Sequence, residues 1–202
     1  MFITVEGGEG GGKSTNLAFI EKYLKDNGKA VVVTREPGGT RLGEKIRHLL
    51  LDTNNSEMVD RAELLLVFAA RAQHLAQVIR PALDADNFVL CDRFTDATYA
   101  YQGSGRGIAK KDIAVLEQWV QDDLRPDLTI LLDLDVEIGM QRAAERGEKD
   151  RFEKQQLDFF RKVRKGYLSM AENEPQRYAI IDASKPLSEV QDQIKKVLEE
   201  RI

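Results

Sequence analysis

The chain has few of the features that mark secreted, membrane or nucleic-acid-binding proteins. It contains one cysteine, Cys91, so an intramolecular disulfide is excluded. No uninterrupted apolar run approaches the roughly 20 residues that span a bilayer. No basic and apolar leader opens the chain either. We therefore expect a cytoplasmic protein without a membrane segment or a secretion signal.

An excess of basic residues is also lacking. The formal net charge is −4 and the sequence pI is about 5.4, whereas general nucleic-acid binders carry surplus Lys and Arg. Internal repeats and low-complexity segments are not found. The composition, 42% hydrophobic and 32% charged, is that of an ordinary globular protein. At this length we expect one α/β domain, residues 1–202, and no nucleic-acid partner.

Glycine, by contrast, is concentrated near the start, where five of the six positions from 7 to 12 are glycine. The stretch GGEGGGKST at 7–15 fits the phosphate-binding pattern G-x-x-x-x-G-K-[ST]. An apolar run at 2–5 precedes it, and apolar residues at helical spacing follow it until Asn27 and Gly28. A loop between a buried strand and a helix N-terminus is an anion site. A flexible glycine-rich hairpin is the alternative, and it does not explain this placement.

Each chemical role in nucleotide binding has a matching residue type in this loop. Backbone N–H groups can surround a phosphate, Lys13 can reach the β- and γ-phosphates of ATP, and the hydroxyl of Ser14 can ligate Mg²⁺. The predicted nucleotide-binding residues are Gly7, Gly8, Glu9, Gly10, Gly11, Gly12, Lys13, Ser14 and Thr15.

Five apolar runs predict buried strands separated by amphipathic helices. They cover residues 2–5, 30–34, 88–91, 128–134 and 178–181. Such runs are typical of a parallel sheet that is covered on both faces, and ligands of such sheets bind at the carboxyl ends of the strands. Charged residues follow these strands, and we expect them to meet at one edge.

Asp92 and Arg93 follow the third of these strands. A carboxylate for Mg²⁺ beside a guanidinium for phosphate is the pairing that phosphoryl transfer requires, so we expect both to be catalytic. Asp133 and Asp135 follow the fourth strand and are alternatives for the metal ligand. We interpret Asp133 as structural.

A basic stretch predicts a short mobile cover, the lid, over about 142–153. Gly147 interrupts the helical pattern amid Arg142, Arg146 and Arg151, which suits arginines that close over a transferring phosphoryl group. The basic residues beyond Arg151 have the alternative of a solvated helical face.

The motifs TREPGGT at 34–40, CDRF at 91–94 and AYQGSGRG at 100–107, together with the glycine-rich loop, resemble thymidylate kinase. The absence of arginine from the loop and its presence in the lid resemble the bacterial type. The resemblance implies a P-loop nucleoside monophosphate kinase fold with an approximately five-stranded parallel sheet. It also implies ATP and Mg²⁺ as cofactors, dTMP as the substrate and a homodimer.

The resemblance further implies the residues of the acceptor site. Glu9 is expected at the 3′-hydroxyl of dTMP and Tyr101 beside its 2′ carbon, while Arg71 is expected on the thymine ring. The base-stacking phenylalanine of the family is displaced here, because Val67 holds its place and Phe68 comes one residue later. The full expected set is Glu9, Arg35, Glu36, Pro37, Arg47, Phe68, Arg71, Arg93, Thr98, Tyr101 and Gln102.

Two other functions stay open at this point. One is a kinase of the same fold for another nucleoside monophosphate or a small alcohol. The other is a non-catalytic nucleotide switch, which would need no second phosphate clamp such as Arg47 with Arg93. His48 and His74 have no matching metal partner and receive no role. Trp119 is expected in core or dimer packing.

Overall fold

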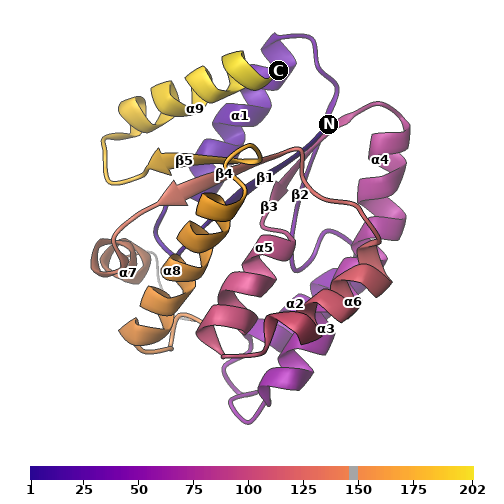
Figure 1. The fold of residues 1–202 in the computed structure, drawn as a ribbon, viewed down its shortest axis with the longest axis vertical. Coiled ribbons are helices and arrows are strands. Elements are labelled where there is room, and N and C mark those ends of the chain that lie inside the picture. Colours follow the sequence, from indigo (N-terminus) through magenta and orange to yellow (C-terminus); the bar gives the residue numbers. More distant parts are fainter. Residues whose placement is uncertain (146–149) are drawn as a thin grey trace.

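The structure is a computed structural model that describes residues 1–145 and 150–202. A five-stranded sheet with the order β2-β3-β1-β4-β5 forms its centre, and all four neighbouring pairs are parallel (Figure 1). The strands are β1 (Phe2–Gly7), β2 (Val31–Arg35), β3 (Phe88–Asp92), β4 (Leu128–Asp133) and β5 (Tyr178–Asp182). The five predicted strands and their parallel arrangement are confirmed, with ends that differ by at most two residues.

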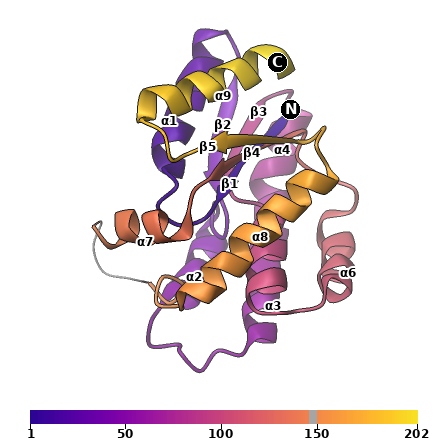
Figure 2. The same ribbon diagram turned by 60° about the vertical axis from the view of Figure 1, so that its left-hand side comes forward.

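Helices cover both faces of the sheet. They are α1 (Lys13–Asp26), α2 (Arg41–Leu51), α3 (Asp60–His74), α4 (Arg80–Asp84), α5 (Thr95–Thr98), α6 (Lys110–Gln121), α7 (Val136–Ala144), α8 (Leu157–Asn173) and α9 (Leu187–Arg201). Two π-helical segments, Leu75–Ile79 and Tyr99–Gly105, continue α3 and α5. Figures 1 and 2 show α1 beside α9 at one side of the sheet, with α3 and α8 on the other.

Alternation along β1 distributes its side chains between these two layers. Ile3 and Val5 pack in the cluster that α1 and α9 cover, whereas Phe2 packs in the cluster of the Leu75–Ile79 segment. Thr4 and Glu6 share the face of Phe2 and are fully buried. Polar groups are therefore buried on the face of the sheet that carries α3, α5 and α8.

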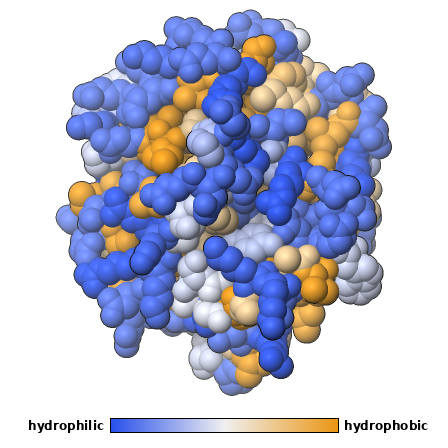
Figure 3. Space-filling view, viewed as in Figure 1, coloured by the Kyte–Doolittle hydropathy of each residue, from blue (hydrophilic) through white to orange (hydrophobic). Residues whose placement is uncertain are grey.

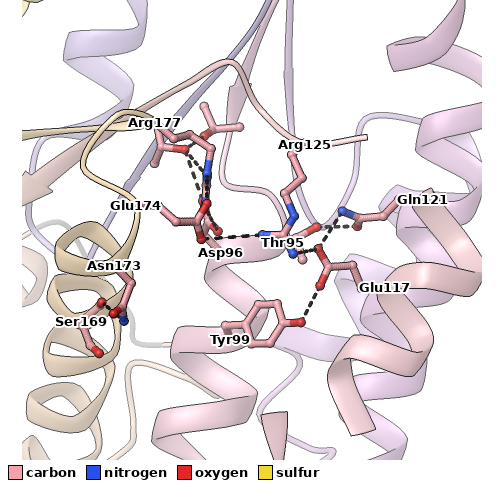
Figure 4. A network of polar contacts seen from close by, with 12 residues as sticks. Thr95, Asp96, Tyr99, Glu117, Gln121, Arg125, Ser169, Asn173, Glu174 and Arg177 are labelled. Atoms are coloured by element: carbon pink, nitrogen blue, oxygen red, sulfur yellow. Dashed lines mark hydrogen bonds and ion pairs between the residues drawn. The ribbon is translucent and has the colours of Figure 1, made fainter. Parts of the chain in front are cut away.

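A network of polar contacts connects the elements on this face of the sheet (Figure 4). Asp96 of α5 accepts hydrogen bonds from Arg177, which precedes β5, and from Thr129 of β4. The hydroxyls of Thr129 and Thr4 lie 3.0 Å apart. The network pairs buried polar groups, as a stable core requires.

One continuous helical stretch, residues 60–84, is long and apolar enough to cross a membrane by length and composition alone. Half of its most apolar window is buried inside the fold. Its buried residues include Glu63, Arg71 and His74, which bind other parts of the chain. The stretch is therefore a core helix of this fold. On the face seen in Figure 3, hydrophobic residues form only separate patches within a mostly hydrophilic surface.

Candidate active site

The phosphate loop connects β1 to α1 at the carboxyl edge of the sheet. Gly10 and Gly12 have φ angles of 71° and 79°, which L side chains rarely adopt. A Cβ on Gly10 would also lie 2.0 Å from the carbonyl oxygen of Gly139 in α7, so no side chain fits there. No described side chain caps the N-terminus of α1. The first amides of the helix are therefore available to an anion.

Lys13 lies folded back on this loop. Its Nζ donates to the carbonyl oxygen of Gly8 at 2.8 Å and lies 3.3 Å from that of Gly7. Burial lowers the pKa of Lys13, and the nearby charge of Arg93 adds to this effect. The ammonium group is thus held at the loop as a partly desolvated cation.

A cavity of about 280 Å³ opens beside the loop, between β3, α2, α3 and α5. Glu9, Gly10, Gly11, Gly12, Lys13 and Ser14 line it from the loop, and Asp92, Arg93, Glu36, Pro37, Arg47, Val67, Arg71, Thr98, Tyr101 and Gln102 line it from other elements. Most of the expected site residues are therefore brought together. Gly7 and Gly8 lie beside a smaller cavity, and Thr15 is exposed on α1.

Asp92 and Ser14 line the same cavity and suit a metal ion. Oδ1 of Asp92 is buried and has no hydrogen-bond partner among residues 1–145 and 150–202. Mg²⁺ is commonly bound by one or two protein oxygens together with phosphates, so this pair fits it. The alternative ligand Asp133 is bound by Arg164, whose Nε lies 2.8 Å from Oδ1, as expected of a structural residue. No group of three His, Cys, Asp or Glu side chains that could hold a metal occurs among the described residues.

Arg93 lines the cavity and has a left-handed backbone conformation, with a φ of 68°. Its guanidinium donates to Glu9 at 2.9 Å and to the hydroxyl of Tyr167 at 3.1 Å, and it lies over the ring of Tyr101. The hydroxyl of Tyr101 also donates to Glu9, at 2.7 Å. Three predicted site residues, Glu9, Arg93 and Tyr101, thus form one hydrogen-bonded group at the carboxyl end of β3.

A buried carboxylate of β1 is connected to this group through the hydroxyl of Tyr167. Glu6 of β1 accepts hydrogen bonds from the hydroxyl of Tyr167 and the backbone N–H of Phe94, both at 2.7 Å. Burial, together with the negative charge of Asp96, raises the pKa of Glu6 to about 8. Sequence reasoning missed both Glu6 and Tyr167, since neither belongs to a motif that carries chemistry.

Arg71 of α3 also lines the cavity. Its Nε donates to Glu36 at 2.7 Å and its Nη2 to the hydroxyl of Thr98 at 2.9 Å. The remaining nitrogen, Nη1, is buried without a partner in the described part of the chain. Such a donor is costly to bury unless a ligand accepts from it.

His74 completes the support of Arg71, although sequence reasoning gave it no role. Its ring lies between Glu36, 3.0 Å from Nδ1, and Thr34, 2.6 Å from Nε2. The spacing of Arg71 and His74 is the only signal in the sequence, since residues three apart share a helix face.

Two residues expected at the substrate do not line this cavity. Phe68 does not line the cavity; it packs against Leu64 and Ile113, and Val67 lines the cavity instead. One residue turns the side chain about 100° around a helix, which is enough to move it from site to core. Arg35 also stays outside the cavity wall, because its half-exposed guanidinium pairs with Glu44 at 2.7 Å.

The lid arginines are placed differently from one another. Arg142 of α7 donates to the carbonyl oxygen of Ala183, after β5. Arg146 lies outside the described residues. Arg151 is buried and binds the carbonyl oxygen of Leu50 and the carboxylate of Glu63, at 2.7 and 2.6 Å. Its guanidinium is therefore bound to α2 and α3, and Arg151 is not among the residues that line the cavity beside the phosphate loop.

Comparison with known proteins agrees with this geometry. The family described as thymidylate kinase matches residues 5–194. A thymidylate kinase of Pseudomonas putida (strain W619) is 60% identical over 198 residues, which are 98% of this chain and 96% of the relative. One of Pseudomonas syringae pv. tomato is 58% identical over 99% of this chain and 95% of the relative. The crystal structure of thymidylate kinase from Ehrlichia chaffeensis superposes with a TM-score of 0.79 at 35% identity and covers 98% of both chains. The chain therefore belongs to the thymidylate kinase family.

Proposed function

We propose that dTMP binds in the cavity beside the phosphate loop, with its base against Arg71 and its 5′-phosphate against Arg47 and Arg93. As a member of its family the chain phosphorylates dTMP to dTDP, with ATP as the phosphoryl donor. The observation that carries the placement is Nη1 of Arg71, a buried donor without a partner in the described residues, on the wall of this cavity. A carbonyl oxygen of thymine would accept a hydrogen bond from this nitrogen.

The chain's own residues divide the work of the reaction. Glycine amides of the loop and the N-terminus of α1 bind the donor's phosphates, and Lys13 supplies a cation beside them. Ser14 and Asp92 would hold Mg²⁺, which neutralises charge on the phosphates when bound. Arg47, whose Nη1 donates to the carbonyl oxygen of Pro37, and Arg93 would orient the acceptor phosphate. The step needs positioning and electrostatic stabilisation, and no covalent intermediate on the protein.

Arginines of the lid would stabilise charge on the transferring group. We assign this role to Arg142 and Arg146. Arg151 is buried and its guanidinium is held by two groups, one of them the carboxylate of Glu63, whereas the hydrogen bond of Arg142 in the described structure goes to a neutral carbonyl oxygen, that of Ala183. This assignment follows the division suggested by the sequence, with no arginine in the glycine-rich loop and arginines in the lid.

An assay of ADP release with and without dTMP tests the proposal. The expected result is release that depends on dTMP, with a KM for dTMP that rises in Arg71→Gln and a KM for ATP that does not change. Release that is independent of any acceptor would favour a nucleotide switch or simple hydrolysis. Equal use of another nucleoside monophosphate would place the specificity outside Arg71.

We also propose a homodimer in the cytoplasm. Trp119 and Val115 of α6 are 81% and 68% exposed, and Leu65 of the neighbouring α3 is 57% exposed. Such an apolar surface suits a second copy of the chain. Sedimentation of the wild type and of Trp119→Glu tests it, with a dimer expected for the first and a shift to monomer for the second. The free, buried thiol of Cys91 suits a reducing compartment.

A further inference from the structure

Glu63 of α3 is a fully buried carboxylate that belongs to none of the motifs above. It accepts hydrogen bonds from three side chains: Arg151 at 2.6 Å, Gln102 at 2.9 Å and Arg106 at 3.1 Å. These donors come from two parts of the chain that are far apart in sequence, the segment Tyr99–Gly105 with the residue after it, and the end of the lid. A carboxylate can accept several hydrogen bonds at once, so Glu63 joins all three.

Through Arg151, Glu63 holds the loop 150–156. The backbone N–H of Arg151 donates to the carbonyl oxygen of Leu51, and its Nε donates to that of Leu50, both at the end of α2. Arg106 binds the same loop from the other side, where its Nη1 donates to Gln155 at 2.9 Å. Figure 2 shows the start of this loop, before α8, next to α2. The loop is therefore docked on α2 and α3 by charged and backbone contacts.

The docked loop forms part of the cavity. Asp150, Phe152 and Glu153 line it, opposite residues of the phosphate loop and α3. The ring of Phe152 contacts that of Tyr101 edge to face, with 6.0 Å between centroids. Gln102 lines the same cavity and is bound to Glu63 by its amide nitrogen. One carboxylate thus supports two walls of the proposed dTMP site.

We propose that Glu63 is a positioning residue for the reaction. Through Arg151 it holds the segment 150–153, which forms part of the cavity wall, and it binds Gln102 directly, so that both stay in place around the acceptor. The inference rests on the placement of dTMP in this cavity. Glu63 is not among the residues that line the cavity and acts through these two side chains. Asp60 cannot replace it, because that carboxylate is half exposed and lies 3.6 Å from Arg106.

The first test compares Glu63→Gln with Glu117→Gln. Glutamine keeps the shape of Glu63 but removes its charge and one acceptor oxygen. We expect the KM for dTMP to rise about tenfold and the KM for ATP to stay within about twofold, since Glu63 binds no residue of the phosphate loop in the described structure. Glu117 of α6 is the matched control, a buried carboxylate bound by Tyr99 and Arg125 away from the cavity (Figure 4). Its variant should change neither KM.

A second test uses Arg151→Gln, and it serves alone if Glu63→Gln does not fold. An arginine that stabilises the transition state would lower kcat at constant KM. An arginine that anchors the wall would instead raise the KM for dTMP. The double variant of Glu63 and Arg151 should be little worse than either single variant, because both remove the same contact.

Hydrogen exchange without substrate separates this inference from the proposed function. Peptides that cover 150–156 should exchange faster in Glu63→Gln than in the wild type, and Glu117→Gln should leave them unchanged. Wild-type exchange of this loop in folded Glu63→Gln would overturn the inference, as would an equal rise of both KM values. If the wild type failed to use dTMP, the function would be refuted, while exchange would still decide whether Glu63 anchors the loop.

Discussion

The guanidinium of Arg71 lies against the carboxylate of Glu36, with 2.7 Å between Nε and Oε2, and both side chains are buried. The same carboxylate is 3.0 Å from Nδ1 of His74. Glu36 therefore compensates a buried charge and orients it, and Nη1 of Arg71 stays buried without a partner in the described part of the chain. Glu36 and Arg71, which the sequence analysis both expects at the substrate, thus form a pair in which Glu36 orients Arg71.

We expect Glu36→Gln to impair both stability and binding. Loss of one partner leaves a buried guanidinium without its counter-charge, which costs about 3 kcal/mol of unfolding free energy, and a misdirected Arg71 should raise the KM for dTMP. Denaturant unfolding and dTMP titration measure the two effects. Asp122→Asn is the control, since the exposed Arg80–Asp122 pair should contribute less than about 1 kcal/mol. An unchanged KM would contradict the orienting role.

Lys13→Ala should cripple turnover in a folded protein. Loss of a cation beside the developing charge costs on the order of 3 kcal/mol, which is about a hundredfold in kcat. Lys22→Ala, on the exposed side of the same helix where Lys22 pairs with Asp26, should have wild-type turnover. Steady-state kinetics measure the kcat of both variants. A near-normal kcat for Lys13→Ala would exclude this loop from the mechanism.

Arg142→Ala and Arg146→Ala test the lid. The effect belongs to the transition state, so kcat should fall at least about tenfold for the responsible arginine while calorimetry shows unchanged dTMP binding. Arg161→Ala, which removes an exposed arginine of α8, should leave both quantities as they are. Wild-type turnover in both lid variants would show that the arginines are misassigned.

The enzyme should prefer 2′-deoxy acceptors because the ring of Tyr101 lines the cavity beside Glu9. A 2′-hydroxyl buried there without a partner costs about 1 to 3 kcal/mol, so ribothymidine monophosphate should be used roughly ten- to a hundredfold less efficiently than dTMP. The ratio of kcat/KM for the two acceptors measures this. Tyr101→Ala should relax the preference, whereas Tyr101→Phe keeps the ring and should retain it. Selectivity that survives in Tyr101→Ala would shift the role to Glu9.

Glu6 should make stability depend on pH. Its pKa is raised from 4.5 to about 8, first by burial and then by Asp96. The folded protein therefore keeps a proton that the unfolded chain releases, so this contribution to stability is fully present below pH 4.5 and is lost as the pH rises through about 8. The Tm of Glu6→Gln relative to the wild type should rise between pH 5 and 8.5. A difference in Tm that stays flat over this pH range would refute the shift.

The parts of this protein that depend on local pattern could be predicted from its amino-acid sequence. Glycines at 7–12 followed by Lys13 predict the phosphate loop, and five apolar runs predict the parallel sheet. The rule that parallel strands end at one edge places Asp92 and Arg93 beside that loop. These inferences succeed because each uses residues that are near in sequence or equivalent in register.

Contacts between side chains of different helices and strands could not be predicted in this way, because they depend on the packing of the fold. Val67 rather than Phe68 lines the cavity because packing against Ile113 of α6 sets the rotation of α3. Arg151 binds Glu63, 88 positions away in sequence, and Arg35 is bound by Glu44 of α2. An arginine in a sequence has many carboxylates within its reach in principle, and its partner is selected by the relative placement of helices, which depends on the packing of the whole core.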